Sequence, residues 1–160
     1  MSFSAHLKGV GVSRMITLVL RLGLGGMFVY ASLHKIIDPQ AFSKSIYNYQ
    51  ILPDQLINLA ALILPWLELF LGLALIGGVG ALGAAACCHG LLWVFFLALV
   101  YNQVRGLNIH CGCFTNATLS AEGPPMLWYF LRDSSLLIAS GILFWLLTVR
   151  NASEKTLETS

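Results

Sequence analysis

The chain has 160 residues, of which 58% are hydrophobic and only 10% are charged, and its formal net charge at pH 7 is +2. Water-soluble domains carry about a quarter charged residues, so this composition excludes an ordinary soluble protein and predicts an integral membrane protein. The small, scattered positive charge excludes a nucleic-acid footprint.

Four long apolar segments follow one another along the chain. Crossing about 30 Å of hydrocarbon takes roughly 20 apolar helical residues. The segments therefore predict spans near residues 15–33, 56–77, 79–101 and 126–149. We expect a single all-α domain over residues 1–150, an integral membrane four-helix bundle. A polar tail over residues 151–160 is expected to be frayed.

The loop after the first span contains a helix signal. Asp38 is a suitable N-cap and Pro39 a suitable first helical residue. Phe42, Ile46 and Tyr49 recur on one helical face. We predict a short interfacial helix in this first outer loop.

The basic residues favour an N-in, C-in orientation. An excess of Lys and Arg marks the cytoplasmic side, and four spans place both termini on one side. The terminal side carries Lys8, Arg14, Arg150 and Lys155, against Lys35, Lys44 and Arg105 on the other side. We therefore expect the loops 34–55 and 102–125 on the outer side of the inner (plasma) membrane. No small-residue cleavage site follows the first segment, so we expect it to be retained.

Cys111 and Cys113 lie in the polar loop between the third and fourth predicted spans. Two sulfurs in a Cys-x-Cys pair close only a small, strained ring, and strained, exposed disulfides exchange readily. His110, with Arg105 upstream, favours the reactive thiolate. We predict that Cys111 and Cys113 are an exchanging redox pair tuned by His110. The alternative is a pair of unreactive loop thiols, or a different disulfide pattern.

Metal capture is a second interpretation of the same loop, because thiolate and imidazole ligands suit Cu(I) or Zn(II). His34, from the first outer loop, would add a ligand to His110 and the two thiols. Closed zinc sites commonly have wider ligand spacing, so redox chemistry is favoured and no metal ligands are assigned.

Cys87 and Cys88 are adjacent within the third predicted span. Neighbouring residues diverge by about 100° on a helix, so a disulfide between them would disrupt it. We predict that both behave as small buried hydrophobes.

Four ionisable residues inside the predicted spans each require a partner or a polar cavity: Arg21, Glu68, Arg132 and Asp133. Arg21 and Glu68 lie at similar depths, about 9 and 12 Å from the inner boundary, and are predicted to pair. Asp133 shares a face with Ser140, and Arg132 can reach toward the thiol loop. These charges either support redox chemistry or only fix helix register.

An ordered set of short motifs supports a family resemblance over about residues 15–149. The motifs are Arg21-Leu22-Gly23-Leu24-Gly25, Lys35-Ile36-Ile37-Asp38-Pro39, Tyr49-Gln50-Ile51-Leu52-Pro53, Pro65-Trp66-Leu67-Glu68, Asn102-Gln103-Val104-Arg105-Gly106 and Cys111-Gly112-Cys113-Phe114. Taken in order, they resemble the MauE branch of the DoxX-like membrane proteins. Thr115 stands where the family pattern often has glycine, which puts the local turn in doubt.

The resemblance implies a four-helix membrane protein of methylamine utilisation. That family is associated with maturation of the disulfide-rich subunit of methylamine dehydrogenase, alongside a thioredoxin-like extracytoplasmic partner. By analogy with the four-helix cores of vitamin K epoxide reductase and DsbB-type proteins, a quinone is a candidate cofactor, although those enzymes use Cys-x-x-Cys.

The sequence therefore predicts a membrane thiol/disulfide redox protein, a candidate thiol–disulfide oxidoreductase that helps a disulfide-containing extracytoplasmic client to mature. Two alternatives stay open. The bundle could be a non-enzymatic scaffold for a thioredoxin-like partner, or a Cu/Zn-binding membrane protein.

Overall fold

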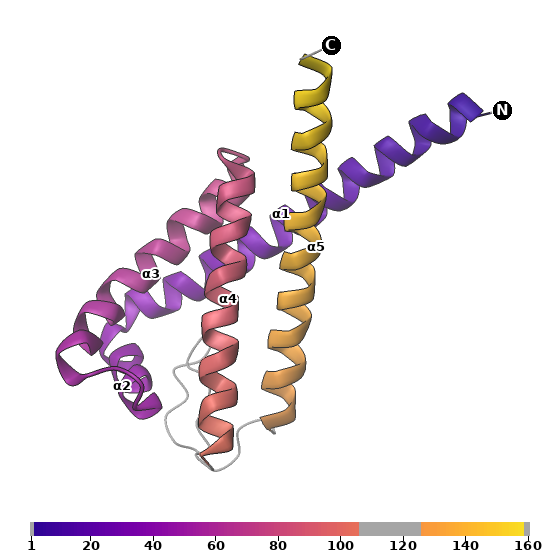
Figure 1. Ribbon diagram of the computed structural model, residues 1–160. Coiled ribbons are helices and arrows are strands. Elements are labelled where there is room, and N and C mark those ends of the chain that lie inside the picture. The colour runs from indigo at the N-terminus through magenta and orange to yellow at the C-terminus, as the bar shows by residue number, and fades with distance from the viewer. Residues whose placement is uncertain (1, 106–125, 159–160) are drawn as a thin grey trace.

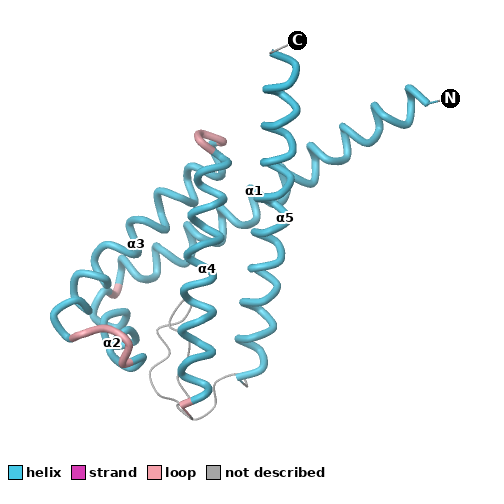
Figure 2. Tube along the Cα trace, in the orientation of Figure 1, coloured by secondary structure: helices cyan, strands magenta, loops and turns pink. Residues whose placement is uncertain are grey.

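The structure, a computed structural model, describes residues 2–105 and 126–158. Its described part contains helices and short connecting turns and no strand (Figure 2). The predicted sites His110, Cys111 and Cys113 lie outside the described residues.

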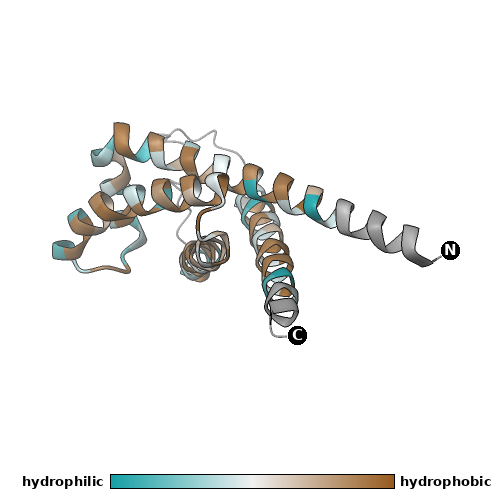
Figure 3. Cartoon of the chain, turned by 90° about the horizontal axis from the view of Figure 1, so that it is seen from above, coloured by the Kyte–Doolittle hydropathy of each residue, from teal (hydrophilic) through white to brown (hydrophobic). Residues whose placement is uncertain are grey.

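Five helices make up this described part (Figure 1): α1 (Ser2–Ile37), α2 (Pro39–Tyr49), α3 (Asp54–Gly77), α4 (Ala81–Val104) and α5 (Met126–Glu158). Four of them are long and apolar enough to cross a membrane, over Ser13–Ile37, Asp54–Gly77, Ala81–Val104 and Leu127–Ser153. The predicted all-α fold with four spans is confirmed. Apolar residues lie along much of the outside of the bundle, as expected for helices that face lipid (Figure 3).

The helices are arranged as two pairs. α3 packs alongside α1, and α4 packs alongside α5 (Figure 1). α1 runs obliquely past α4 and α5 (Figure 1).

Close approach of α1 and α3 depends on two glycines. A Cβ atom added at Gly25 would lie 2.9 Å from the carbonyl oxygen of Gly72, and one added at Gly72 would lie 2.8 Å from the carbonyl oxygen of Gly25. Small residues drive helix association in lipid because they let two backbones approach closely.

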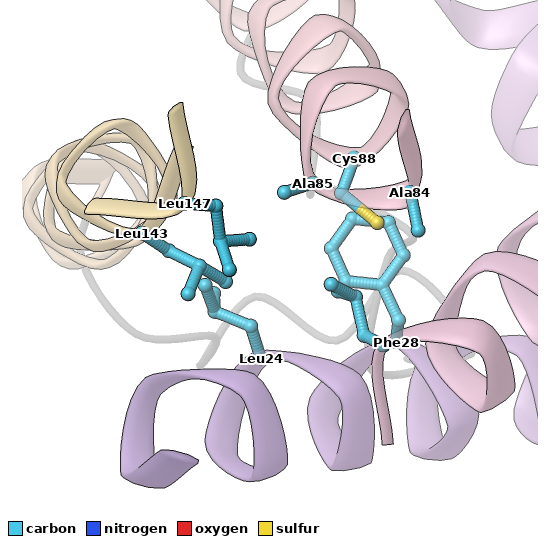
Figure 4. Packing of buried hydrophobic residues seen from close by; sticks show 8 residues of the cluster. Leu24, Phe28, Ala84, Ala85, Cys88, Leu143 and Leu147 are labelled. Atoms are coloured by element: carbon cyan, nitrogen blue, oxygen red, sulfur yellow. The ribbon is translucent and has the colours of Figure 1, made fainter. Parts of the chain in front are cut away.

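The core of the bundle joins all four spanning helices (Figure 4). Leu24 and Phe28 of α1 face α4 and α5, and the other buried members are Leu75, Ala84, Ala85, Cys88, Leu143 and Leu147. Because Leu24 and Phe28 lie in this core, the other residues on the same face of α1 also point into the bundle.

The helix α2 has the predicted start. The Asp38 side chain accepts a hydrogen bond from the backbone N–H of Ala41 at 3.0 Å, and Pro39 is in the first turn. Phe42, Ile46 and Tyr49 line one crevice and therefore share a face, as predicted.

Two helix ends lie beyond the positions expected from the sequence. The first predicted span ended at residue 33, whereas α1 continues to Ile37. The fourth ended at residue 149, whereas α5 continues to Glu158 through the segment expected to be frayed. The first difference matters most, because it moves Lys35 from the predicted loop into the bundle.

Candidate functional site: a buried charge cluster

Lys35 and Glu68 form an ion pair inside the bundle. The Lys35 Nζ atom donates to both carboxylate oxygens of Glu68, at 2.6 Å to Oε1 and 2.7 Å to Oε2. Lys35 is only 1% exposed and Glu68 only 2%. Neither charge is tolerable alone in a low-dielectric interior, so each helix depends on the other for neutralisation.

Aromatic rings complete the surroundings of the ammonium group. Lys35 Nζ lies 4.9 Å from the ring centroid of Phe42 in α2 and 5.0 Å from that of Phe95 in α4. Both distances are within the range of a cation–π attraction. The lysine therefore connects α1 to three other helices.

A small cavity of about 30 Å³ lies beside the ion pair. Its lining includes Lys35 and Glu68, and also Asp133 of α5, which is 7% exposed. A cavity of this size has room for about one water molecule, and its three ionisable side chains supply the polar partners that such a water needs. Lys35, Glu68 and Asp133 thus line one small space inside the apolar bundle and together form the buried charge cluster.

Arg132 neutralises Asp133. Its Nε and Nη2 atoms each lie 2.9 Å from Asp133 Oδ1. The guanidinium carbon also lies 5.4 Å from the ring centroid of Tyr129, one turn earlier. The Arg132 side chain therefore lies along its own helix and holds the neighbouring carboxylate.

The predicted pairing of Arg21 with Glu68 is wrong. Arg21 Nε donates to the carbonyl oxygen of Leu75 at 2.9 Å, and Nη2 lies 3.4 Å from that of Ile76. These carbonyls belong to the last turn of α3, where backbone oxygens lack helical partners and the helix dipole favours a cation. Arg21 therefore caps α3, and Lys35 is the residue that pairs with Glu68.

Beyond this cap, Gly78 has φ +76°, and a Cβ there would clash with the Arg21 guanidinium. The left-handed conformation and the close guanidinium both require glycine.

A second polar contact joins α4 to α5. His89 Nδ1 lies 2.8 Å from Ser140 Oγ, and Trp93 Nε1 donates to His89 Nε2 at 3.0 Å. Because Nε2 accepts from Trp93, the imidazole hydrogen lies on Nδ1, and this N–H donates a hydrogen bond to the Ser140 hydroxyl. The Ser140 hydroxyl in turn donates to the Leu137 carbonyl oxygen at 2.9 Å. This chain of hydrogen bonds fixes the α4/α5 register.

Cys88 is 1% exposed and belongs to the hydrophobic core, as predicted. Cys87 is exposed on the outside of α4, so the prediction that it is buried is wrong. The roughly 100° step between adjacent helical residues explains the difference.

The sequence reasoning did not assign Lys35, which is buried, or His89, which is half-buried, to polar contacts inside the bundle, and it did not single out the buried Thr17, Ser32 and Asn102. For Lys35 a signal was present, because Leu24, Phe28, Ala31 and Lys35 recur on one helical face. A lysine that continues a buried apolar face requires an acidic partner. His89 gave no comparable signal.

The described residues flanking the thiol loop also make contacts. Arg105 Nη2 donates to Gln50 Oε1 at 3.0 Å, and its guanidinium carbon lies 5.3 Å from the ring centroid of Tyr101. His34, the additional metal ligand considered above, packs edge-on against Tyr30. Over residues 2–105 and 126–158 no three His, Cys, Asp or Glu side chains gather as a metal site.

An apolar crevice of about 200 Å³ adjoins the cluster. Phe42 and Phe95, the rings that flank the Lys35 ammonium, also line this crevice. Tyr49, Ile51 and Val94 are among its other walls. The two rings therefore separate the buried charge from an apolar space beside α2.

The fold and the cluster define a multi-pass helical membrane protein with a neutralised charge network in its interior. Comparison with known families makes the assignment specific. The profile of the family described as "Methylamine utilisation protein MauE" matches residues 13–146. The chain belongs to the MauE family.

Two relatives illustrate the extent of the similarity. The chain is 33% identical over 129 residues to "Methylamine utilization protein MauE" of Paracoccus denitrificans, covering 80% of this chain and 67% of the relative. It is 32% identical over 141 residues to the protein of the same name from Methylorubrum extorquens, covering 87% and 74%. No solved structure matches the chain.

Proposed function

We propose that this protein takes part in methylamine utilisation as a membrane thiol/disulfide redox protein that helps an extracytoplasmic, disulfide-containing client to mature. The observation that carries the proposal is the Cys111-Gly112-Cys113 motif in a chain of the MauE family. The family supplies the pathway, and the paired thiols supply a chemistry suited to maturation of disulfides.

The exchange needs both cysteines. With the pair oxidised, a client thiolate attacks one sulfur and a mixed disulfide forms while the other cysteine leaves as a thiolate. A second client thiolate then attacks the mixed disulfide, so the client gains a disulfide and Cys111 and Cys113 become a dithiol. Two electrons and two protons pass to this protein, and the reverse sequence reduces the client.

In this proposal the protein lies in the inner membrane with both termini in the cytoplasm. The Cys111–Cys113 loop then faces the oxidising side, where a thioredoxin-like protein is the proposed exchange partner. The charge cluster positions the helices on either side of that loop, because Asp133 lies in α5, which follows it, and Phe95 in α4, which precedes it.

A quinone is the proposed acceptor that reoxidises the pair. Dithiol plus quinone gives disulfide plus quinol, which balances the two electrons and two protons. Support comes from the apolar, aromatic-walled crevice beside Phe42 and Phe95, which has space for a lipophilic ring.

The test is client oxidation in cells that carry Cys111→Ser or Cys113→Ser, with Cys87→Ser as the matched control outside the loop. We expect the client's thiols to remain reduced with either loop variant and to be oxidised normally with the control. Full client oxidation by the loop variants would overturn the proposal and favour the scaffold interpretation. Copper or zinc retained by wild type and lost in both loop variants would favour the metal-binding alternative.

A further inference from the structure

Three arginines converge on one cleft at the end of the bundle where both termini lie. The cleft has a volume of about 380 Å³ and is lined by Arg14, Met15, Thr17, Leu18 and Arg21 of α1 and by Arg150 of α5. This site is separate from the charge cluster and from the crevice beside α2.

Helix packing creates the cleft. Leu24 of α1 packs against Leu143 and Leu147 of α5 (Figure 4). Beyond this contact the N-terminal part of α1 and the C-terminal part of α5 diverge (Figure 1). Arg150 lies about one turn past Leu147, so it stands where the two helices separate.

The position along the helices matches a membrane interface. Arg14 lies at the start of the span Ser13–Ile37, and Arg150 lies close to the end of the span Leu127–Ser153. Arg21 lies two turns deeper than Arg14 and caps the end of α3. The positive charge thus extends from the headgroup level inward.

Apolar side chains accompany the arginines. Met15 is 70% exposed and Leu18 is 52% exposed, and both line the cleft. Such side chains are positioned to contact acyl chains, while guanidinium groups bind phosphate oxygens through paired hydrogen bonds. A ligand with both parts fits the cleft better than a free anion does.

We propose that this cleft is a binding site for the headgroup of an anionic phospholipid. Basic pockets between spanning helices are suited to phosphate headgroups, and each Lys or Arg near a membrane surface contributes about 1 kcal/mol of attraction. The site is independent of the thiol chemistry, and it would tie α1 to α5 through the lipid phosphate.

The test is native mass spectrometry of the purified full chain in detergent, titrated with phosphatidylglycerol or with phosphatidylcholine. We expect preferential binding of phosphatidylglycerol, weakened about five-fold in Arg14→Gln and further in the double variant with Arg150→Gln. Binding of phosphatidylcholine should be unchanged, which also reports that the variants remain folded. Lys44→Gln, an exposed charge removed on α2, is the matched control and should bind like wild type.

Equal binding of the two lipids, or unchanged phosphatidylglycerol binding in the double variant, would overturn the proposal. So would an equal loss in Lys44→Gln, which would indicate general attraction to the charged protein. Competition with glycerol phosphate separates the sources of the anion. Displacement of phosphatidylglycerol at equimolar glycerol phosphate would indicate a site for soluble phosphates and contradict a lipid site.

Discussion

Replacing one member of the Lys35–Glu68 pair should destabilise the bundle far more than replacing both. At 2.6 Å and an effective dielectric constant of about 20, the Coulomb attraction is about 6 kcal/mol, and desolvation of the two ions offsets much of it. The net contribution of the pair is therefore small. Breaking it leaves a buried charge without a partner, which costs about 3–5 kcal/mol.

The assay is a double-mutant cycle on unfolding in mixed detergent and SDS micelles, with Lys35→Met, Glu68→Gln and the combined variant. We expect each single variant to lose about 3 kcal/mol and the double variant to lose less than the sum of the two. Lys44→Met, which removes an exposed lysine, should change stability by less than about 0.5 kcal/mol. Additive single effects below about 1 kcal/mol would refute a buried, coupled pair.

Three further outcomes follow from the packing. Gly25→Ala should destabilise the bundle by about 1–3 kcal/mol in SDS unfolding, because the added Cβ meets the α3 backbone. Gly23→Ala should be nearly neutral in the same assay, because no atom lies within 4 Å of the added Cβ. Ser140→Ala should cost about 1 kcal/mol in the same assay, because it removes the acceptor of the α4/α5 imidazole contact. A small apolar maleimide should label Cys87 of the micelle-bound protein much faster than Cys88, compared in single-cysteine variants by mass spectrometry; equal rates would contradict the packing of α4.

The spans and the short helix were predictable because their signals are local. The length of an apolar segment predicts a spanning helix without knowledge of the neighbouring helices. Asp38 and Pro39 mark the start of α2 because their side chains suit the N-cap and the first helical position. The end of α1 was less predictable. The polar residues His34 and Lys35 indicated a loop, although a lysine is a good helix former and can face inward when a carboxylate neutralises it.

Charge pairing depends on how helices lie against one another, which a single sequence does not specify. Arg21 and Glu68 have compatible depths, yet depth alone does not place them on facing sides. Arg21 meets the end of α3 instead, where free carbonyl oxygens provide a partner that no side-chain pattern reveals. The buried face that Lys35 shares with Leu24 and Phe28 is the one local signal that pointed to the observed pair.

The most direct test of the account is the redox state of Cys111 and Cys113 in the native membrane. Mass-tag alkylation before and after reduction, in a variant lacking Cys87 and Cys88, counts their free thiols. We predict two tags after reduction and a shift between untagged and doubly tagged protein when the supply of oxidant changes. Two thiols that stay fully tagged, or fully untagged, under every condition would contradict a redox role for this protein.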